Sequence, residues 1–149
     1  KIKYLTSSSL HLEKVLSASN FLLINESEAF LLTSENNINN AASSLLKMGP
    51  EVVVIKKGSR GAELFSLTEH ITVDAFPVTN VVDPTGAGDV FAGAFVASLA
   101  NEDSKETALL NASASASISI ESFGIEKIQS ASNNEINDRI NFLNKTLKS

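Results

Sequence analysis

Short apolar runs that alternate with amphipathic segments set the pattern of this chain. The runs at residues 21–24 and 52–55 are apolar at every position, which is typical of strands covered on both faces in a parallel sheet. Shorter strands are predicted at residues 62–67, 70–75 and 78–82. Helices are predicted at residues 7–17, 26–32, 38–48, 90–100, 106–122 and 136–147. Strands that alternate with helices predict an α/β fold, and a length of 149 residues predicts one domain, residues 1–149.

The prediction of the helix at residues 106–122 requires a choice between strand periodicity and helical periodicity. Residues 112–117 alternate strictly between Ala and Ser, which is the period of a strand. Ala favours helix, however, and the flanking segments have helical spacing. We therefore predict a helix that carries a face of small residues.

The composition excludes several classes of protein. The chain contains no Cys, so disulfide frameworks, thiolate metal sites and thiol nucleophiles are excluded. The formal net charge of −5 argues against a nucleic-acid surface, which needs a basic face. The longest apolar stretch, residues 90–100, is shorter than the roughly 18 residues that a membrane helix needs. We expect a cytoplasmic protein with neither nucleic-acid nor membrane partners.

The segment from Asp83 to Asp89 offers the strongest candidate chemistry. Gly86, Ala87 and Gly88 stand just before an apolar helix, where unblocked backbone N–H groups and the helix dipole favour an anion. The Asp89 carboxylate beside such a pocket could accept the proton of an attacking alcohol. The alternative is structural: Thr85 or Asp83 caps the helix, and the glycines form a turn. The residues alone favour neither interpretation.

Two known glycine-rich motifs do not match this segment. A P-loop would have Lys followed by Ser or Thr after the glycines, and a dinucleotide fingerprint would have a third Gly. A nicotinamide-dependent oxidoreductase is therefore disfavoured.

Asn25 and Glu28 follow the first apolar run and form a second candidate site. Their spacing of three places both on one face near a helix start, where their oxygens could organise a hydrated Mg²⁺. The same spacing also describes a capping box, in which Asn is the N-cap and Glu the third helical residue. Taken alone, the capping box is the favoured interpretation.

The segment after the second apolar run forms a third candidate. Two glycines with basic neighbours could wrap nucleotide phosphates through backbone amides, and the residues concerned are Lys56, Gly58, Ser59, Arg60 and Gly61. Taken alone, a hairpin-like turn with solvated charges is the favoured interpretation. All three candidates, however, lie just beyond the carboxyl ends of predicted apolar strands, the edge where open α/β sheets bind ligands.

These motifs together resemble a known family. The stretch Asp83 to Gly93 is similar to the Asp-x-Thr-Gly-Ala-Gly-Asp-x-Phe signature of the ribokinase-type (PfkB) carbohydrate kinases. Asn25 and Glu28 match the family's Asn-x-x-Glu motif, and residues 56–61 resemble its Thr-x-Gly-x-x-Gly nucleotide loop. The resemblance implies a ribokinase-like three-layer α/β/α fold, Rossmann-like, with a mostly parallel sheet.

The resemblance also implies a role for each matching residue. Asp89 would be the catalytic base, and Gly86, Ala87 and Gly88 the anion hole for the γ-phosphoryl group of ATP. Asn25 and Glu28 would act on Mg²⁺–ATP, largely through water. The remaining nucleotide contacts would come from Lys56, Gly58, Ser59, Arg60, Gly61 and Asn111, the last near the adenine.

The chain departs from the family in three respects. Lys56 stands where the family often has Thr. Asp83 and Thr85 would contribute to a monovalent cation site, but residues 121–124 do not match the ribokinase pattern, which argues against bound K⁺. Family members are about twice as long, and the N-terminal half with its lid and most sugar contacts is absent here.

We therefore expect the ATP-side, C-terminal half of a kinase for a sugar or related alcohol. The isolated chain is expected to be inactive, and either a missing N-terminal half or self-association would complete it. The alternative is a non-catalytic nucleotide-binding or interaction fragment. The sequence does not identify the sugar.

Overall fold

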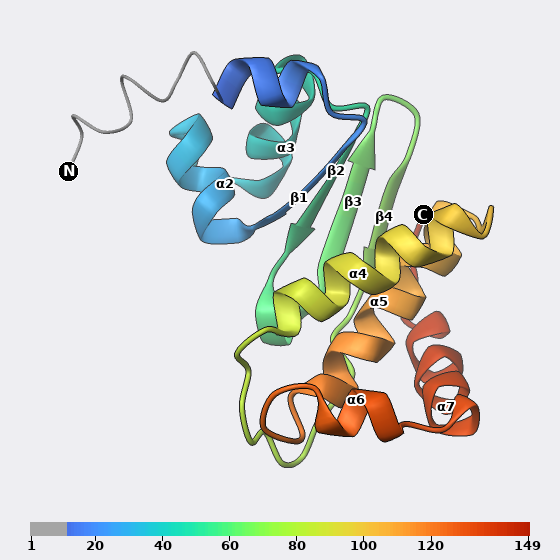
Figure 1. Cartoon of the computed structure of the whole chain (residues 1–149). Helices are drawn as coiled ribbons and strands as arrows, with labels where there is room; N and C mark the ends of the chain where they lie inside the picture. The colour runs from blue at the N-terminus through green and yellow to red at the C-terminus, as the bar shows by residue number, and fades with distance from the viewer. Residues whose placement is uncertain (1–11) are drawn as a thin grey trace. The chain divides into compact units, whose positions relative to one another are not determined.

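The computed structural model describes residues 12–149 (Figure 1). Residues 12–17 are helical, as predicted, whereas residues 7–11 of that predicted helix lie outside the described residues. Four strands form one sheet in the order β1-β2-β3-β4. Their bounds are β1 (Phe21–Asn25), β2 (Val52–Lys56), β3 (Ala62–Ser66) and β4 (His70–Val73).

The helices follow the sequence prediction closely. Their bounds are α2 (Glu26–Thr33), α3 (Ile38–Lys47), α4 (Ala87–Ala100), α5 (Lys105–Ser119), α6 (Glu126–Ser130) and α7 (Asn133–Asn144). Among residues 12–149, none of these helices combines the length and apolar character that crossing a bilayer requires.

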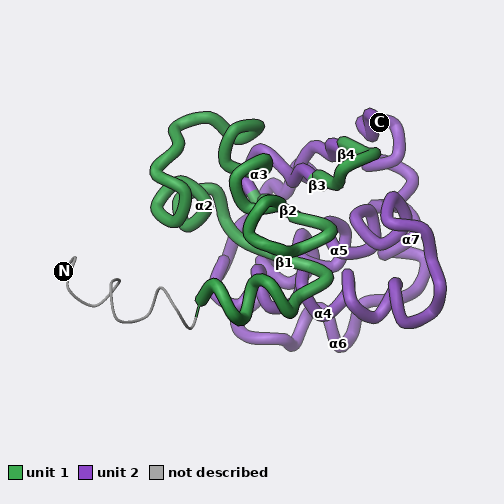
Figure 2. The backbone as a smooth tube through the Cα atoms, turned by 90° about the horizontal axis from the view of Figure 1, so that it is seen from above, with its two compact units in different colours: residues 1–56, 64–70 green, residues 57–63, 71–149 purple. Residues whose placement is uncertain are grey.

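The backbone divides into two compact units, one running to residue 56 with residues 64–70, the other holding residues 57–63 and 71–149 (Figure 2).

The two all-apolar runs are the parallel pair of the sheet. Strand β1 pairs with β2 in parallel, in a register that places Phe21 beside Val52 and Asn25 beside Lys56. The residues of β2 up to Ile55 are buried, as a strand covered on both faces requires. Strands β3 and β4 form a hairpin whose turn is closed by the Ser66 N–H donating to the Glu69 carbonyl (2.9 Å). The sheet is therefore mixed, within an α/β fold.

The core of the first unit lies where α2 and α3 pack against the strands. Helix α3 begins where the Asn37 side chain accepts hydrogen bonds from the N–H groups of Asn39 and Asn40. Small residues on both helices bring their backbones close to the strands. The core residues are Ile24, Ala29, Ala41, Ala42, Leu45, Val53, Ile55 and Phe65.

The core of the second unit is built around α5, and the choice of helix over strand for its Ala/Ser segment is confirmed. Helices α4 and α5 lie side by side (Figure 1). The buried Arg139 of α7 donates to the Ser117 hydroxyl (3.0 Å) and to the carboxylates of Glu121 (2.8 Å) and Glu135 (3.3 Å). Its guanidinium also lies 4.6 Å from the centre of the Phe76 ring. Arg139 thereby ties α7 to α5.

The structure corrects the sequence prediction at three places. The predicted strand at 78–82 is wrong: prolines at 77 and 84 flank this segment, and the Val82 and Asp83 N–H groups donate to the Ile120 carbonyl instead of to a strand. Helix α6 was not predicted, because five residues are too few to show a period. Helix α7 begins at Asn133 rather than 136, because the Ser132 hydroxyl caps it, and ends at Asn144.

Arg139→Ala should lower the free energy of unfolding by about 2–4 kcal/mol, since it removes the buried guanidinium that donates to two carboxylates and to a buried hydroxyl. Urea denaturation followed by circular dichroism measures this. The matched control is Lys127→Ala, because its ammonium lies 3.4 Å from Glu135 but its side chain is 39% exposed. That variant should lose about 0.5 kcal/mol or less. Equal losses for the two variants would contradict a role for burial.

Candidate functional site

The glycine segment lies at the N-terminus of α4, as predicted. Gly86 is the N-cap and adopts a left-handed conformation (φ 79°, ψ −6°), which favours glycine at this position. Its carbonyl accepts hydrogen bonds from the N–H groups of Asp89 (2.9 Å) and Val90 (3.0 Å). No side chain caps the helix, so the capping roles considered for Asp83 and Thr85 are not observed. The first turn therefore presents backbone N–H groups, of which that of Ala87 donates to the Pro84 carbonyl (3.2 Å), with the exposed Asp89 beside them.

Asp83 has a different task, in the turn that leads into α4. Its Oδ1 accepts a hydrogen bond from the Thr85 N–H (2.9 Å). This bond, together with one to the Thr85 side chain, lowers the pKa of Asp83 below its ordinary value of 3.8. The turn is also attached to α5, because the Asp83 N–H donates to the Ile120 carbonyl. Asp83 is therefore ionised at neutral pH and fixes the backbone just before the glycines.

Asn25, Glu28 and Lys56 all belong to the first unit. The Glu28 N–H donates to Asn25 Oδ1 (2.8 Å) and the Asn25 N–H donates to Glu28 Oε2 (3.1 Å), so the predicted capping box is confirmed. Lys56 stands beside Asn25 in the parallel register of β1 and β2. The capping box uses Oε2, one of the two oxygens of the Glu28 carboxylate, and does not involve the other oxygen, Oε1. Amide and carboxylate oxygens thus lie at the carboxyl end of a parallel pair, where α/β sheets bind ligands.

Residues 58–61 form the predicted turn, which contains a short 3₁₀ helix, Gly58–Arg60. Gly58 and Gly61 have positive φ angles of 59° and 86°. A Cβ atom on Gly61 would lie 2.0 Å from the Val73 carbonyl oxygen, whereas one on Gly58 would meet open space. The turn is thus held against the end of β4, and Gly61 has no room for a side chain.

Asn111 lies half-buried on α5 and joins this helix to α4. Its Nδ2 donates to the hydroxyl of Ser98 (2.7 Å), which is buried. No local pattern indicates this partner, because the two residues lie on different helices and Ser98 belongs to no motif. Asn111 therefore has a structural contact, and its expected place near an adenine stays a prediction.

The second unit thus holds the α4 N-terminus with Asp89, the turn at 58–61, and Asn111. The first unit holds Asn25, Glu28 and Lys56. Within residues 12–149, no group of three or more His, Cys, Asp or Glu side chains is placed to hold a metal ion. Any divalent cation at Asn25 and Glu28 would therefore need water or ligand oxygens to complete its shell.

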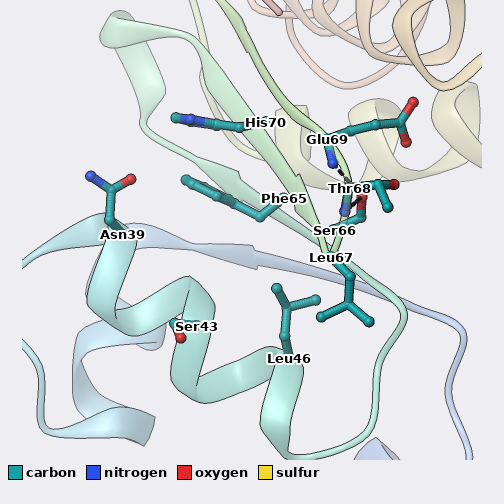
Figure 3. A pocket seen from close by; sticks show the side chains of 9 residues that line it. All are labelled: Asn39, Ser43, Leu46, Phe65, Ser66, Leu67, Thr68, Glu69 and His70. Carbon is teal, nitrogen blue, oxygen red and sulfur yellow. Dashed lines mark hydrogen bonds between the residues drawn. The ribbon is translucent and has the colours of Figure 1, made fainter.

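A hollow in the first unit contains none of these residues. It lies between α3 and the β3–β4 turn, and in Figure 3 the rings of Phe65 and His70 stack on its upper side, 4.3 Å apart. The Ser66 hydroxyl accepts from the Thr68 and Glu69 N–H groups and so shapes the turn. No residue that the motifs single out lines it, so we do not place the functional site there. Its lining is Asn39, Ser43, Leu46, Phe65, Ser66, Leu67, Thr68, Glu69 and His70.

Comparisons with known proteins agree with the motifs. The model of the pfkB family of carbohydrate kinases matches residues 3–131. Ribokinase from Bacillus subtilis is 34% identical over 114 residues, covering 76% of this chain and 37% of that protein.

Solved structures share the fold. Arabidopsis thaliana ribokinase, complexed with ribose and ATP, superposes with a TM-score of 0.74 and 30% identity, covering 86% of this chain and 43% of that one. An Escherichia coli protein assigned as ribokinase II, in complex with ATP and Mg²⁺, gives a TM-score of 0.79 and 29% identity over 95% of this chain and 46% of that one. The ribokinase-like fold expected from the motifs is confirmed. The chain spans less than half the length of these relatives.

Gly61→Ala should lower the free energy of unfolding by about 2–4 kcal/mol, because its methyl group would collide with the Val73 carbonyl. The control is Gly58→Ala, which has space for the methyl group and meets only the cost of a positive φ, about 1 kcal/mol. Thermal and urea denaturation measure both. A larger loss for Gly58→Ala would contradict the tight packing assigned to Gly61.

The Asp83 carboxyl should titrate with a midpoint below 3.8, measured by NMR of its side-chain carbonyl carbon. Since the pKa is depressed in the folded state, the resulting stabilisation is complete above the unfolded value and is lost as the pH falls through the folded one. Thr85→Ala removes the hydroxyl contact but keeps the N–H donor, so it should return the midpoint part of the way to 3.8. A midpoint at or above 3.8 in the unmodified chain would contradict the assigned turn.

Proposed function

Because this chain belongs to the pfkB family of carbohydrate kinases, we propose that it is the ATP-side half of a kinase that transfers the γ-phosphoryl group of ATP to a hydroxyl of a small sugar or related alcohol. The uncapped N-terminus of α4, with Asp89 in its first turn, is the observation that carries the proposal. Phosphoryl transfer depends mainly on positioning and on charge stabilisation, and this arrangement supplies both.

The chemistry assigned to α4 needs two kinds of group. The backbone amides of Gly86, Ala87 and Gly88 face the negative charge on the transferred phosphoryl oxygens, assisted by the helix dipole. Asp89 accepts the proton of the acceptor hydroxyl as its oxygen bonds to the γ-phosphorus and the bond to ADP breaks. An exposed carboxylate suits this task, because the acceptor must reach it.

The divalent ion and the nucleotide are assigned to further residues of the chain. Asn25 and Glu28 fit a hydrated Mg²⁺, since the capping box leaves one carboxylate oxygen of Glu28 uncommitted to it. When bound, Mg²⁺ neutralises phosphate charge. Lys56, in register with Asn25, adds a cation at the same strand ends. The nucleotide loop, residues 58–61, lines the phosphates, and Asn111 lies near the base. We propose no K⁺ site at Asp83 and Thr85.

The length of the chain shapes the proposal further. Relatives are more than twice as long as the segment they share with this chain, and the acceptor sugar is assigned to the portion that this chain lacks. Among the strands of residues 12–149, β1 stands at one end of the sheet order, which is an edge where further strands would join. We propose that turnover requires, in addition to this segment, the portion of these relatives that lies outside the match.

Nucleotide binding is the first test. The chain should bind a non-hydrolysable ATP analogue saturably, with a micromolar dissociation constant that weakens when Mg²⁺ is removed, as measured by isothermal titration calorimetry. Reduced nicotinamide dinucleotide serves as the competing ligand and should not bind. A folded chain that binds no nucleotide would contradict an ATP site formed by this half alone.

The catalytic base is tested by Asp89→Asn. In a chimera that joins the N-terminal part of Bacillus subtilis ribokinase to this chain, this change should lower kcat about 10²–10⁴-fold, because the proton acceptor is gone. Affinity for the ATP analogue should change little. The control is Asp103→Asn, an acidic residue after α4 with no assigned role. Turnover that survives in Asp89→Asn means that the base is assigned wrongly, whereas nucleotide binding without any chimeric turnover favours a non-catalytic binding module.

A further inference from the structure

An ion pair connects the two ends of the proposed nucleotide loop, residues 58–61. Lys57 Nζ lies 2.7 Å from Glu63 Oε1, and each side chain is only 14% exposed. Lys57 stands immediately before the loop and Glu63 lies on β3, so the pair links the residue that enters the loop to the strand that leaves it. Nothing assigned above to the site uses either residue.

The backbone around Lys57 reinforces this link. Its N–H donates to the Gly61 carbonyl (2.8 Å), and its carbonyl accepts from the Arg60 N–H (3.2 Å). The ion pair adds a third connection, from the side chain. At the other end, the close approach of Gly61 to the Val73 carbonyl leaves the loop no room to shift toward β4. The loop is therefore constrained from both sides.

We propose that Lys57 and Glu63 are positioning residues for nucleotide binding, which hold the loop amides in the arrangement that receives the phosphates. This inference rests on the kinase function proposed above. Holding a loop in its bound conformation raises affinity, because less conformational entropy is lost when the ligand binds. The pair therefore affects binding without touching the nucleotide.

Positioning of the loop by Lys57 and Glu63 can be distinguished from a contribution of the pair to folding stability alone. A partly buried ion pair can often be replaced by apolar residues of similar volume at little cost in stability. An apolar pair has no directional bond, however, and would not fix the distance across the loop. A double variant Lys57→Met with Glu63→Leu should therefore keep its melting temperature and still bind nucleotide more weakly.

The geometry also separates it from direct contact between Lys57 and phosphate. If Lys57 bound phosphate itself, Glu63 would compete for its ammonium group, and Glu63→Gln would leave affinity unchanged or raise it. If the pair positions the loop, Glu63→Gln lowers affinity although it removes a negative charge near an anionic ligand. The direction of this one change therefore distinguishes the two roles.

The test compares Glu63→Gln, Lys57→Met, the apolar double variant and the charge-reversed double variant Lys57→Glu with Glu63→Lys. The probe is the ATP analogue with Mg²⁺, titrated by calorimetry. We expect the two single changes and the apolar double variant to weaken binding about fivefold to tenfold, a loss of about 1–1.4 kcal/mol. The charge-reversed variant should recover most of the affinity. Glu51→Gln, in which the replaced carboxylate accepts a hydrogen bond from the Asn20 side chain (3.3 Å), is the control and should bind normally.

Amide hydrogen exchange tests whether the ion pair holds the loop, and this test does not depend on the kinase proposal. The Lys57 and Gly61 amides should exchange faster in Glu63→Gln than in the unmodified chain, while amides of α5 stay unchanged. If the unmodified chain binds no nucleotide, the kinase proposal fails in this half, and the exchange rates alone decide whether the pair holds the loop. Unchanged exchange, or folded Glu63→Gln with full affinity, would overturn the inference.

Discussion

The start of α4 depends on the need to satisfy backbone polar groups in a segment that has no strand partner. Between β4 and α4 the chain runs without a ladder, and the Ile120 carbonyl at the end of α5 accepts the N–H groups of both Val82 and Asp83. Asp83 then bonds the Thr85 N–H, and the left-handed Gly86 turns the chain into the helix. The position of the N–H groups that form the proposed anion hole is therefore set by another helix, about thirty residues later in sequence.

Helix α5 therefore has two roles: it packs against α4, and its C-terminal end holds the segment that precedes α4. Its small residues allow close packing with α4, while its C-terminal carbonyl holds the segment before α4. A hydrogen bond from Asn111 to Ser98 joins the two helices. The Arg139 contacts bind α7 to the same helix from another side. Packing and site geometry are thus parts of one arrangement within the second unit, and a change that loosens α5 should disturb the glycine segment without touching it.

Local patterns predicted most of the fold. Two runs of apolar residues were sufficient to locate β1 and β2, and periodic spacing was sufficient to locate the long helices, because both signals reflect which faces are buried. The segment at 78–82 misled the prediction since its Val residues favour strands, whereas strand formation also needs a partner, which no local pattern reports. Helix α6 is too short to show a period. The boundaries of α7 followed its Ser132 cap rather than its apolar residues.

The candidate site was predictable to the same degree. Motif spacing located the glycines at a helix start and indicated the Asn25–Glu28 box, since both depend on neighbours in sequence. Contacts between distant residues gave no signal, and the Asn111–Ser98 bond is an example. The Lys57–Glu63 pair lies between these cases: opposite charges on either side of a glycine turn were visible in the sequence, but only the structure shows them at contact distance and largely buried.

The division of the backbone into two interleaved units determines what a single cleavage of the chain can separate. The chain passes from one compact unit to the other after residue 56, returns after residue 63, and passes again after residue 70. A single cut by a protease, or a single split of the gene, therefore leaves the two units covalently joined or divides one of them internally. Neither unit can be expressed as one continuous segment of this sequence, because each consists of two stretches that the other interrupts.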